Sequence, residues 1–166
     1  MQEAHIQEAT AHETVNGDEV RVPTNEWTTA ALAHASVLLT VILGTPGGLG
    51  IPIGLAVPLV MYFGYRRNSR YIAFHSLQAF VYQVVGTIGI ASLGALVAIA
   101  WTISGTLSAV LFGLLLIPLA LTLTLLLVCA IIAWFVYGLY AAYQVYQGND
   151  FRYWLIGERL EEEVTL

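Results

Sequence analysis

Residues 66–80 read RRNSRYIAFHSLQAF, and the first five of them, 66–70, separate the two longest uncharged segments of the chain. No Asp, Glu, Lys or Arg occurs in the 39 positions of 27–65 or in the 79 positions of 71–149. About 20 consecutive apolar residues suffice to cross a bilayer. A soluble domain of this length could not bury so much apolar surface. The sequence therefore predicts an integral membrane protein.

The basic residues indicate how the chain is threaded through the membrane. They occur before the first uncharged segment, between the two segments and after the second: Arg21; Arg66, Arg67 and Arg70; Arg152 and Arg159. Because Lys and Arg near the ends of spans stay cytoplasmic, all three places should share one side. Each uncharged segment then crosses the membrane an even number of times. We predict an all-α fold, a polytopic integral membrane four-helix bundle built from two helical hairpins, with N and C termini cytoplasmic.

Turn signals inside the uncharged segments set the predicted helix boundaries. TPGGLGIPIG (45–54) and SGT (104–106) interrupt helical sequence with glycine and proline. The transmembrane domain is predicted at 27–149, with helices at approximately 26–44, 51–65, 71–103 and 107–146. The second helix is short, which indicates either local bilayer thinning or a broken helix that lines a polar cavity. Pro118 leaves open whether 107–117 belongs to the last helix or is re-entrant.

The two ends of the chain carry its acidic charge. Segment 1–26 has six acidic residues and one arginine, and we expect an acidic, disordered cytoplasmic tail. Segment 150–166 has five acidic residues and two arginines, and we expect a second cytoplasmic tail. This acidity argues against a nucleic-acid partner. The single cysteine, Cys129, allows neither an internal disulfide nor a multi-cysteine metal site.

Polar residues inside the predicted spans form the candidate site. His34 and His75 should enter the membrane to similar depths, and His75, Gln78 and Tyr82 share one helix face. With Gln83 they make a candidate interhelical polar cluster. Such a cluster is a hydrogen-bond clamp, a polar path or proton relay, or a pair of axial haem ligands. We favour the clamp, with no cofactor and no metal, because the spans offer no carboxylate to support a metal-bound histidine.

The charged and catalytic candidates in the membrane region are few. Arg66, Arg67 and Arg70 are expected to fix the topology and to contact anionic lipid headgroups. The region contains no HExxH, GxSxG or phosphate-binding loop. We therefore expect no enzymatic activity and no catalytic residues.

Four stretches carry a resemblance to a known family: AALAHAS (30–36), Pro58-Leu59-Val60, SRYIAFHSLQAF (69–80) with Gln83 following, and FRYWLIGERL (151–160). They resemble a bacterial four-helix membrane family of unassigned function, related to the channel subunit of the chloroplast inner-envelope protein translocon. The most specific matches are His34 and the stretch His75, Gln78, Ala79. Trp154 stands where members often carry proline. The resemblance implies four helices with cytoplasmic ends, and it implies a function only weakly.

Three functions compete at this point. The first is a non-enzymatic accessory, scaffold or assembly subunit of a larger membrane complex, such as an energy-transducing one. Its partners would be the lipid bilayer and other membrane subunits, or further copies of itself, in the bacterial inner membrane. The second is an oligomeric, translocon-like or solute conduit. The third is a membrane protein that binds a cofactor through His34 and His75.

Overall fold

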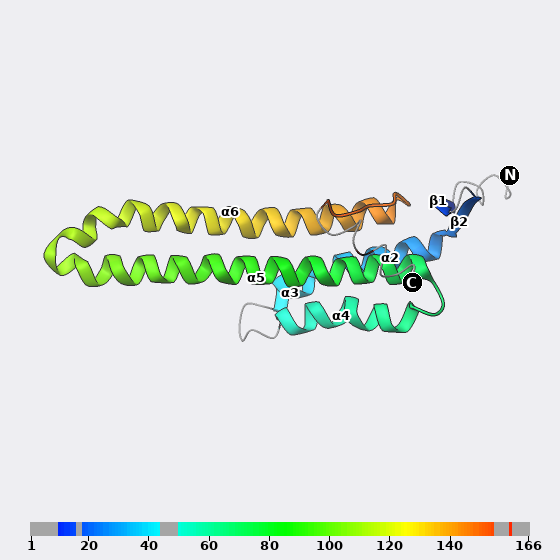
Figure 1. Cartoon of the computed structure of the whole chain (residues 1–166), viewed down its shortest axis with the longest axis horizontal. Helices are drawn as coiled ribbons and strands as arrows, with labels where there is room; N and C mark the ends of the chain where they lie inside the picture. Colours follow the sequence, from blue (N-terminus) through cyan, green and yellow to red (C-terminus); the bar gives the residue numbers. More distant parts are fainter. Residues whose placement is uncertain (1–9, 16–17, 44–49, 155–159, 161–166) are drawn as a thin grey trace. The chain divides into compact units, whose positions relative to one another are not determined.

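The fold is described from a computed structural model, which describes residues 10–15, 18–43, 50–154 and 160. Figure 1 shows the helices and strands in chain order. They are β1 (Thr10–Val15), β2 (Asp18–Pro23), α2 (Thr24–Ala35), α3 (Val37–Leu43), α4 (Gly50–Tyr65), α5 (Arg70–Leu107), the short 3-10 helix η1 (Ser108–Val110) and α6 (Phe112–Tyr146). Outside the two strands, the described elements are helical.

Three helical segments are long and apolar enough to cross a membrane: Thr24–Leu43, Arg70–Leu107 and Phe112–Tyr146. The remaining apolar helix, α4, has only 16 residues. At 1.5 Å per residue its length is about 24 Å, less than the roughly 30 Å hydrocarbon core. α6 continues through Pro118 without interruption, so residues 112–117 belong to the last helix. These segments have the composition of a multi-pass membrane protein.

The two strands lie within the segment that was expected to be a disordered tail. β1 and β2 pair in antiparallel register, with Thr10 opposite Pro23 and Val15 opposite Asp18. α2 begins directly after the second strand, at Thr24, two residues before the predicted start of the first helix. Residues 1–9 and 16–17 lie outside the described residues, and the disorder of the tail stays a prediction.

The first predicted helix, 26–44, is divided at Ser36 into α2 and α3. The Ser36 hydroxyl donates to the carbonyl of Ala33 at 2.7 Å. The carbonyl of Ser36 accepts from the N–H of Leu39 at 3.0 Å, three residues on, so the turn is tighter than an α-helix. The helix thus divides at a residue whose side chain and main chain both bond to groups three residues away.

The turn between the two long helices was predicted at 104–106, and this prediction is wrong. These residues lie inside α5, and the Thr106 hydroxyl bonds back to the carbonyl of Thr102 at 2.6 Å. The chain reverses instead at 108–111, where Leu111 adopts the left-handed conformation with φ 64°. A hydroxyl that bonds to its own helix tolerates a helical position, so the SGT sequence did not have to be a turn.

The turn requires a glycine at position 113 but not at position 105. A Cβ atom on Gly113 would overlap backbone atoms of Ser104 and Leu107. A Cβ atom on Gly105 would meet nothing within 4 Å. Close backbone approach, which sequence alone does not reveal, therefore fixes the position of the reversal.

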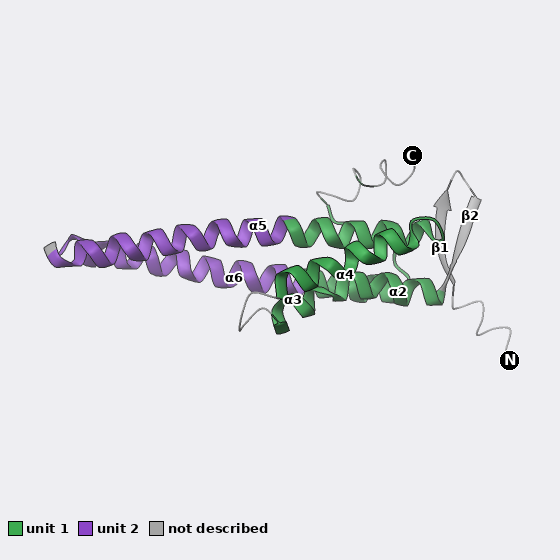
Figure 2. Ribbon diagram, turned by 90° about the horizontal axis from the view of Figure 1, so that it is seen from below, with its two compact units in different colours: residues 1–84, 137–166 green, residues 85–136 purple. Residues whose placement is uncertain are grey.

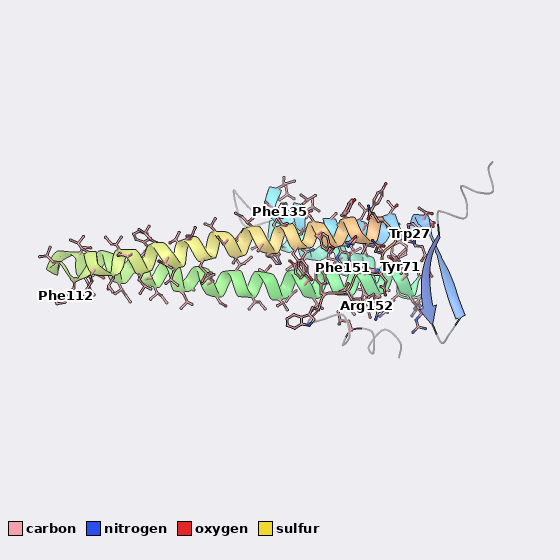
Figure 3. All side chains as sticks on the ribbon, turned by 90° about the horizontal axis from the view of Figure 1, so that it is seen from above. Trp27, Tyr71, Phe112, Phe135, Phe151 and Arg152 are labelled. Carbon is pink, nitrogen blue, oxygen red and sulfur yellow. The ribbon has the colours of Figure 1, made fainter. Side chains whose placement is uncertain are left out.

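The chain divides into two compact units, shown in two colours in Figure 2. Unit 1 contains residues 1–84 and 137–166. Its buried apolar core comprises Trp27, Ala30, Ala31, Tyr71 and Val145, with Phe151 packed against it. Trp27, Tyr71 and Phe151 are labelled in Figure 3.

Unit 2, residues 85–136, is a helical hairpin formed by parts of α5 and α6. Gly86 lies against the indole of Trp134, where no Cβ atom would fit. Trp101 Nε1 donates to Thr124 Oγ1 at 3.0 Å. Large apolar side chains such as Leu115, at 78% exposure, cover its outer surface. Such a surface is stable in contact with lipid rather than water.

Candidate functional site

The start of α5 places the candidate residues. Ser69 caps the helix, because its hydroxyl oxygen accepts from the N–H of Ile72 at 3.2 Å. The same hydroxyl donates to Glu26 Oε2 at 2.7 Å, so it also ties the start of α5 to α2. The next turn of α5 then presents His75 towards α2, which supplies His34.

His34 and His75 form a buried pair. His34 Nε2 lies 3.4 Å from His75 Nδ1, and the ring planes meet edge to face at 71°. The two residues are 1% and 0% exposed. The other ring nitrogens face the segment that follows α6. His34 Nδ1 lies 3.2 Å from the hydroxyl of Tyr153, and His75 Nε2 lies 3.9 Å from Asp150 Oδ1.

The tautomers of the two histidines set the direction of the hydrogen bonds between them and to Tyr153. The 3.9 Å contact of His75 Nε2 with Asp150 is electrostatic, because it is too long for a hydrogen bond. With the proton of His75 on Nε2, towards Asp150, His75 Nδ1 accepts from His34 Nε2–H and His34 Nδ1 accepts from the Tyr153 hydroxyl. With the other tautomers both bonds reverse, because each neutral imidazole has one donor and one acceptor. Asp150 is also paired with Arg152 at 2.7 Å.

Gln78 holds the main chain of the same segment. Its amide nitrogen donates to the carbonyl of Phe151 at 3.1 Å, and its amide oxygen accepts from the N–H of Tyr153 at 3.0 Å. The ring of Tyr82 stacks on Tyr153 at 4.1 Å with an interplanar angle of 3°. Residues 150–153, called the C-terminal segment below, are thus held on the helices through both main chain and side chains.

The environment of Tyr153 favours its neutral form. Burial is the largest effect that raises the pKa of Tyr153, and the neighbouring Tyr82 and Tyr137 hydroxyls raise it further. A neutral hydroxyl can donate to His34, whereas a phenolate cannot. The raised pKa therefore keeps the Tyr153 hydroxyl able to donate to His34 Nδ1.

Gln83 takes part in a different contact from the other predicted residues. Its amide nitrogen donates to Ser36 Oγ at 2.8 Å, and its amide oxygen lies 3.5 Å from Thr40 Oγ1. It therefore links α5 to the break between α2 and α3. The structure brings His34, His75, Gln78 and Tyr82 together at the C-terminal segment and places Gln83 apart from them.

The histidine pair does not have the geometry of a haem site. Axial ligands lie on opposite faces of the macrocycle, whereas here the facing nitrogens of His34 and His75 are 3.4 Å apart and bonded to each other. Among the described residues, no group of three or more His, Cys, Asp or Glu side chains could hold a metal ion. The arrangement instead joins α2, α5 and the C-terminal segment.

Residues 25–160 match a protein family described as magnetosome magnetite crystal formation proteins, MamF/MmsF. The chain belongs to this family. No curated protein and no solved structure matches the chain. The family is a bacterial membrane family, as the resemblance implied, but the match shows no relation to the chloroplast translocon subunit.

In this MamF/MmsF family member, sequence reasoning missed the residues that complete the site. Asp150, Phe151 and Tyr153 were assigned to a cytoplasmic tail, because the charge count placed the end of the last span before them. The available signal was the pair of aromatic residues at alternate positions, Phe151 and Tyr153, shortly after the end of α6 at Tyr146. Tyr153 is only 3% exposed. The side chain of Trp154, the next residue, is 87% exposed.

The three mid-chain arginines of the family member lie at the turn from α4 to α5. Arg66, Arg67 and Arg70 are exposed. The Arg66 guanidinium lies over the ring of Phe63 at 5.2 Å, which orients one charge beside an apolar side chain. This placement is compatible with the predicted role at a lipid surface.

Proposed function

We propose that the chain is a non-enzymatic accessory membrane protein that takes part in the formation of magnetite crystals within a membrane compartment. The observation that carries the proposal is the extent of the family match, residues 25–160. The match covers all the helices and also the C-terminal segment that closes the histidine pair. The proposed role therefore belongs to the whole helical protein rather than to one tail.

The contacts of the buried polar residues support a structural role for them. Both ring nitrogens of His34 are engaged, one by His75 and one by Tyr153. Both amide atoms of Gln78 are engaged by the main chain. Groups that are occupied in this way join helices, whereas a catalytic or transport site needs polar atoms that reach a substrate. None of these contacts favours the hypothesis of a conduit.

We also propose that the arginine turn rests on a lipid surface, with both chain ends on the same, cytoplasmic, side. Arg66, Arg67 and Arg70 lie between two apolar helices, a position at which basic residues stay cytoplasmic. Each arginine near an anionic surface contributes about 1 kcal/mol of attraction. The proposed location is the bacterial inner membrane or a compartment of the same topology.

The proposed function is tested by expressing the chain in a magnetite-forming bacterium that lacks its own members of the family. We expect the chain to change the size or shape distribution of the crystals, measured by electron microscopy, while the number of membrane compartments stays the same. A matched strain should carry the Gln78→Leu variant, and a second should carry the exposed Gln147→Leu change. Crystals identical with and without the wild-type chain would contradict the proposal.

A further inference from the structure

We propose that the side chain of Trp154 inserts into the bilayer at the boundary between the hydrocarbon core and the headgroups, and so anchors the C-terminal segment at the membrane surface. The partner is the phospholipid itself, and no second protein is required. This inference goes beyond the proposed role in crystal formation and does not depend on it. It rests on the exposed side chains of α6 and on the contacts of the segment.

The exposed side chains of α6 change in kind at residue 137. The large exposed side chains of residues 112–136 are leucine, isoleucine, valine and phenylalanine, whereas those of residues 137–146 are all tyrosine. At 1.5 Å per residue, 112–136 is about 36 Å long, which crosses a hydrocarbon core of roughly 30 Å with some tilt. Tyrosine and tryptophan gather where the hydrocarbon meets the headgroups. The boundary of the core therefore falls near Tyr137.

The contacts of Tyr137 carry this depth over to α5 and to the C-terminal segment. The ring centroid of Tyr137 lies 5.9 Å from that of Tyr82 on α5 and 5.4 Å from that of Tyr153. Tyr82 and Tyr153 are themselves stacked at 4.1 Å. These three aromatic rings therefore lie at one level, and Tyr153 brings the segment to the boundary of the hydrocarbon core.

The C-terminal segment runs towards the hydrocarbon core rather than away from it. It begins at Asp150, whose Oδ1 atom lies 3.9 Å from His75 Nε2. It ends at Tyr153, which stacks on Tyr82. Tyr82 follows His75 by two helical turns, or about 10 Å, along α5, and beyond it α5 continues in its uncharged stretch. Trp154, the next residue, therefore starts at the boundary itself.

The side chains of the segment match the layers of the bilayer. The guanidinium of Arg152 lies over the ring of Phe74 at 5.8 Å, one helical turn from Arg70, and so at the depth of the headgroups. The indole of Trp154 is 87% exposed on the protein. An indole combines an apolar ring with one N–H donor, so it can contact acyl chains and still reach the carbonyl groups of the lipids.

Fluorescence quenching tests the insertion. The full-length chain is reconstituted into vesicles of phosphatidylcholine and phosphatidylglycerol, and the emission of Trp154 is the difference between wild type and Trp154→Phe. Lipids brominated near the carbonyl end of the acyl chains should quench this emission about fivefold more than aqueous iodide does, because the indole lies at that depth. Trp101→Phe isolates an indole that is 42% exposed within a span, and Trp27→Phe isolates one that is 7% exposed. Bromine should quench the first control, and neither quencher should reach the second.

A spin label supplies the second measurement. The label is attached at Trp154→Cys or at Gln147→Cys, each in a Cys129→Ser background. Gln147 is the matched control, because it is exposed directly after the end of α6 and lies well beyond Tyr137. The label at 154 should collide mainly with oxygen, which dissolves in hydrocarbon, and the label at 147 mainly with a water-soluble nickel chelate. Circular dichroism verifies that each variant keeps its helices.

Three results would overturn the proposal. If iodide quenches Trp154 as strongly as lipid bromine does, the indole faces water. If neither quencher reaches it, protein covers the indole instead of lipid. If the label at 154 collides mainly with the nickel chelate, position 154 lies outside the bilayer.

Discussion

Tyr153 connects the C-terminal segment to the histidine pair through one hydroxyl group. That hydroxyl lies 3.2 Å from His34 Nδ1, and its ring is stacked on Tyr82. Burial, with Tyr82 and Tyr137 as further causes, raises the pKa of Tyr153 in the docked state above its ordinary value of about 10. The docked segment therefore holds the tyrosine proton more tightly than the free segment does.

The raised pKa predicts how docking depends on pH. The contribution of Tyr153 is fully present below pH about 10, and it is lost as the pH rises from the ordinary pKa towards the raised one. Fluorotryptophan at position 154 and fluorine NMR should report release of the segment at alkaline pH. Tyr153→Phe should dock more weakly by about 1 to 3 kcal/mol, because His34 Nδ1 loses its donor, and should lose the alkaline transition.

A tyrosine with an exposed hydroxyl gives the control for this titration. The Tyr143 hydroxyl accepts from Gln147 at 2.6 Å on the outside of α6. Tyr143→Phe should therefore leave the alkaline transition unchanged. A transition that persists in Tyr153→Phe would show that another group causes it.

The sequence predicted part of the site, for physical reasons that can be named. His34 and His75 were placed together because polar residues at equal depth in a membrane need each other as partners. Helical spacing put Gln78 and Tyr82 on the face of His75. Gln83 was included as a polar residue of the same helix, but its amide nitrogen donates to Ser36. The C-terminal segment was missed because its contacts are tertiary and have no periodicity.

At the scale of the elements, the reversal between α5 and α6 shows what local sequence signals leave out. Glycine and serine at 104–106 were taken as the turn, yet the left-handed position is occupied by Leu111. The helical pattern of the long spans was readable, because apolar composition persists over whole helices. The position of the turn could not be read from the sequence, because it depends on the close approach of Gly113 to the backbone of Ser104.

Leu111 should be a point of strain in this reversal. A left-handed conformation costs a residue with a Cβ atom about 1 to 2 kcal/mol, whereas glycine adopts it freely. Leu111→Gly should therefore stabilise the α5–α6 hairpin by about 1 kcal/mol, and Leu111→Val should destabilise it, since branching at Cβ increases the strain. The measurement is the unfolding free energy in mixed detergent and denaturant.

Loss of an exposed leucine is the effect that must be separated from relief of strain. Leu114 is 53% exposed in the first turn of α6 and has ordinary helical geometry. Leu114→Gly should destabilise the protein by about 1 kcal/mol, the usual cost of glycine in a helix. Opposite signs for Leu111→Gly and Leu114→Gly would establish the strain, and equal losses would contradict it.

At the scale of the whole molecule, helix lengths and charge together determine how the chain meets the membrane. α5 has 38 residues and α6 has 35, or about 57 and 53 Å at 1.5 Å per residue. Both exceed a hydrocarbon core of roughly 30 Å, so each must extend into an interface. Buried polar groups and the arginine turn lie near the ends of these helices that share unit 1, where an aqueous interface can solvate the charges.

This arrangement predicts that the turn before α5 and the turn after it lie on opposite sides of the membrane. Asn68 and Ala109 are exposed positions in these two turns. We would introduce Asn68→Cys or Ala109→Cys into a Cys129→Ser background, because Cys129 is itself exposed. A membrane-impermeant maleimide should label position 68 from the cytoplasmic side and position 109 from the other side, because the arginines beside Asn68 resist translocation.

Cysteines near the two ends of the chain report on which side of the membrane the ends lie. If the chain forms two membrane hairpins, Gln2→Cys and Thr165→Cys in the same background should label from the same side as Asn68→Cys. If position 68 labels opposite to position 165, the chain crosses an odd number of times after the arginine turn, and the four-helix topology is wrong. If positions 68 and 109 label from one side, α5 does not cross at all. Helix length alone does not determine whether the chain crosses the membrane an even or an odd number of times. The side from which these four positions label decides between the two.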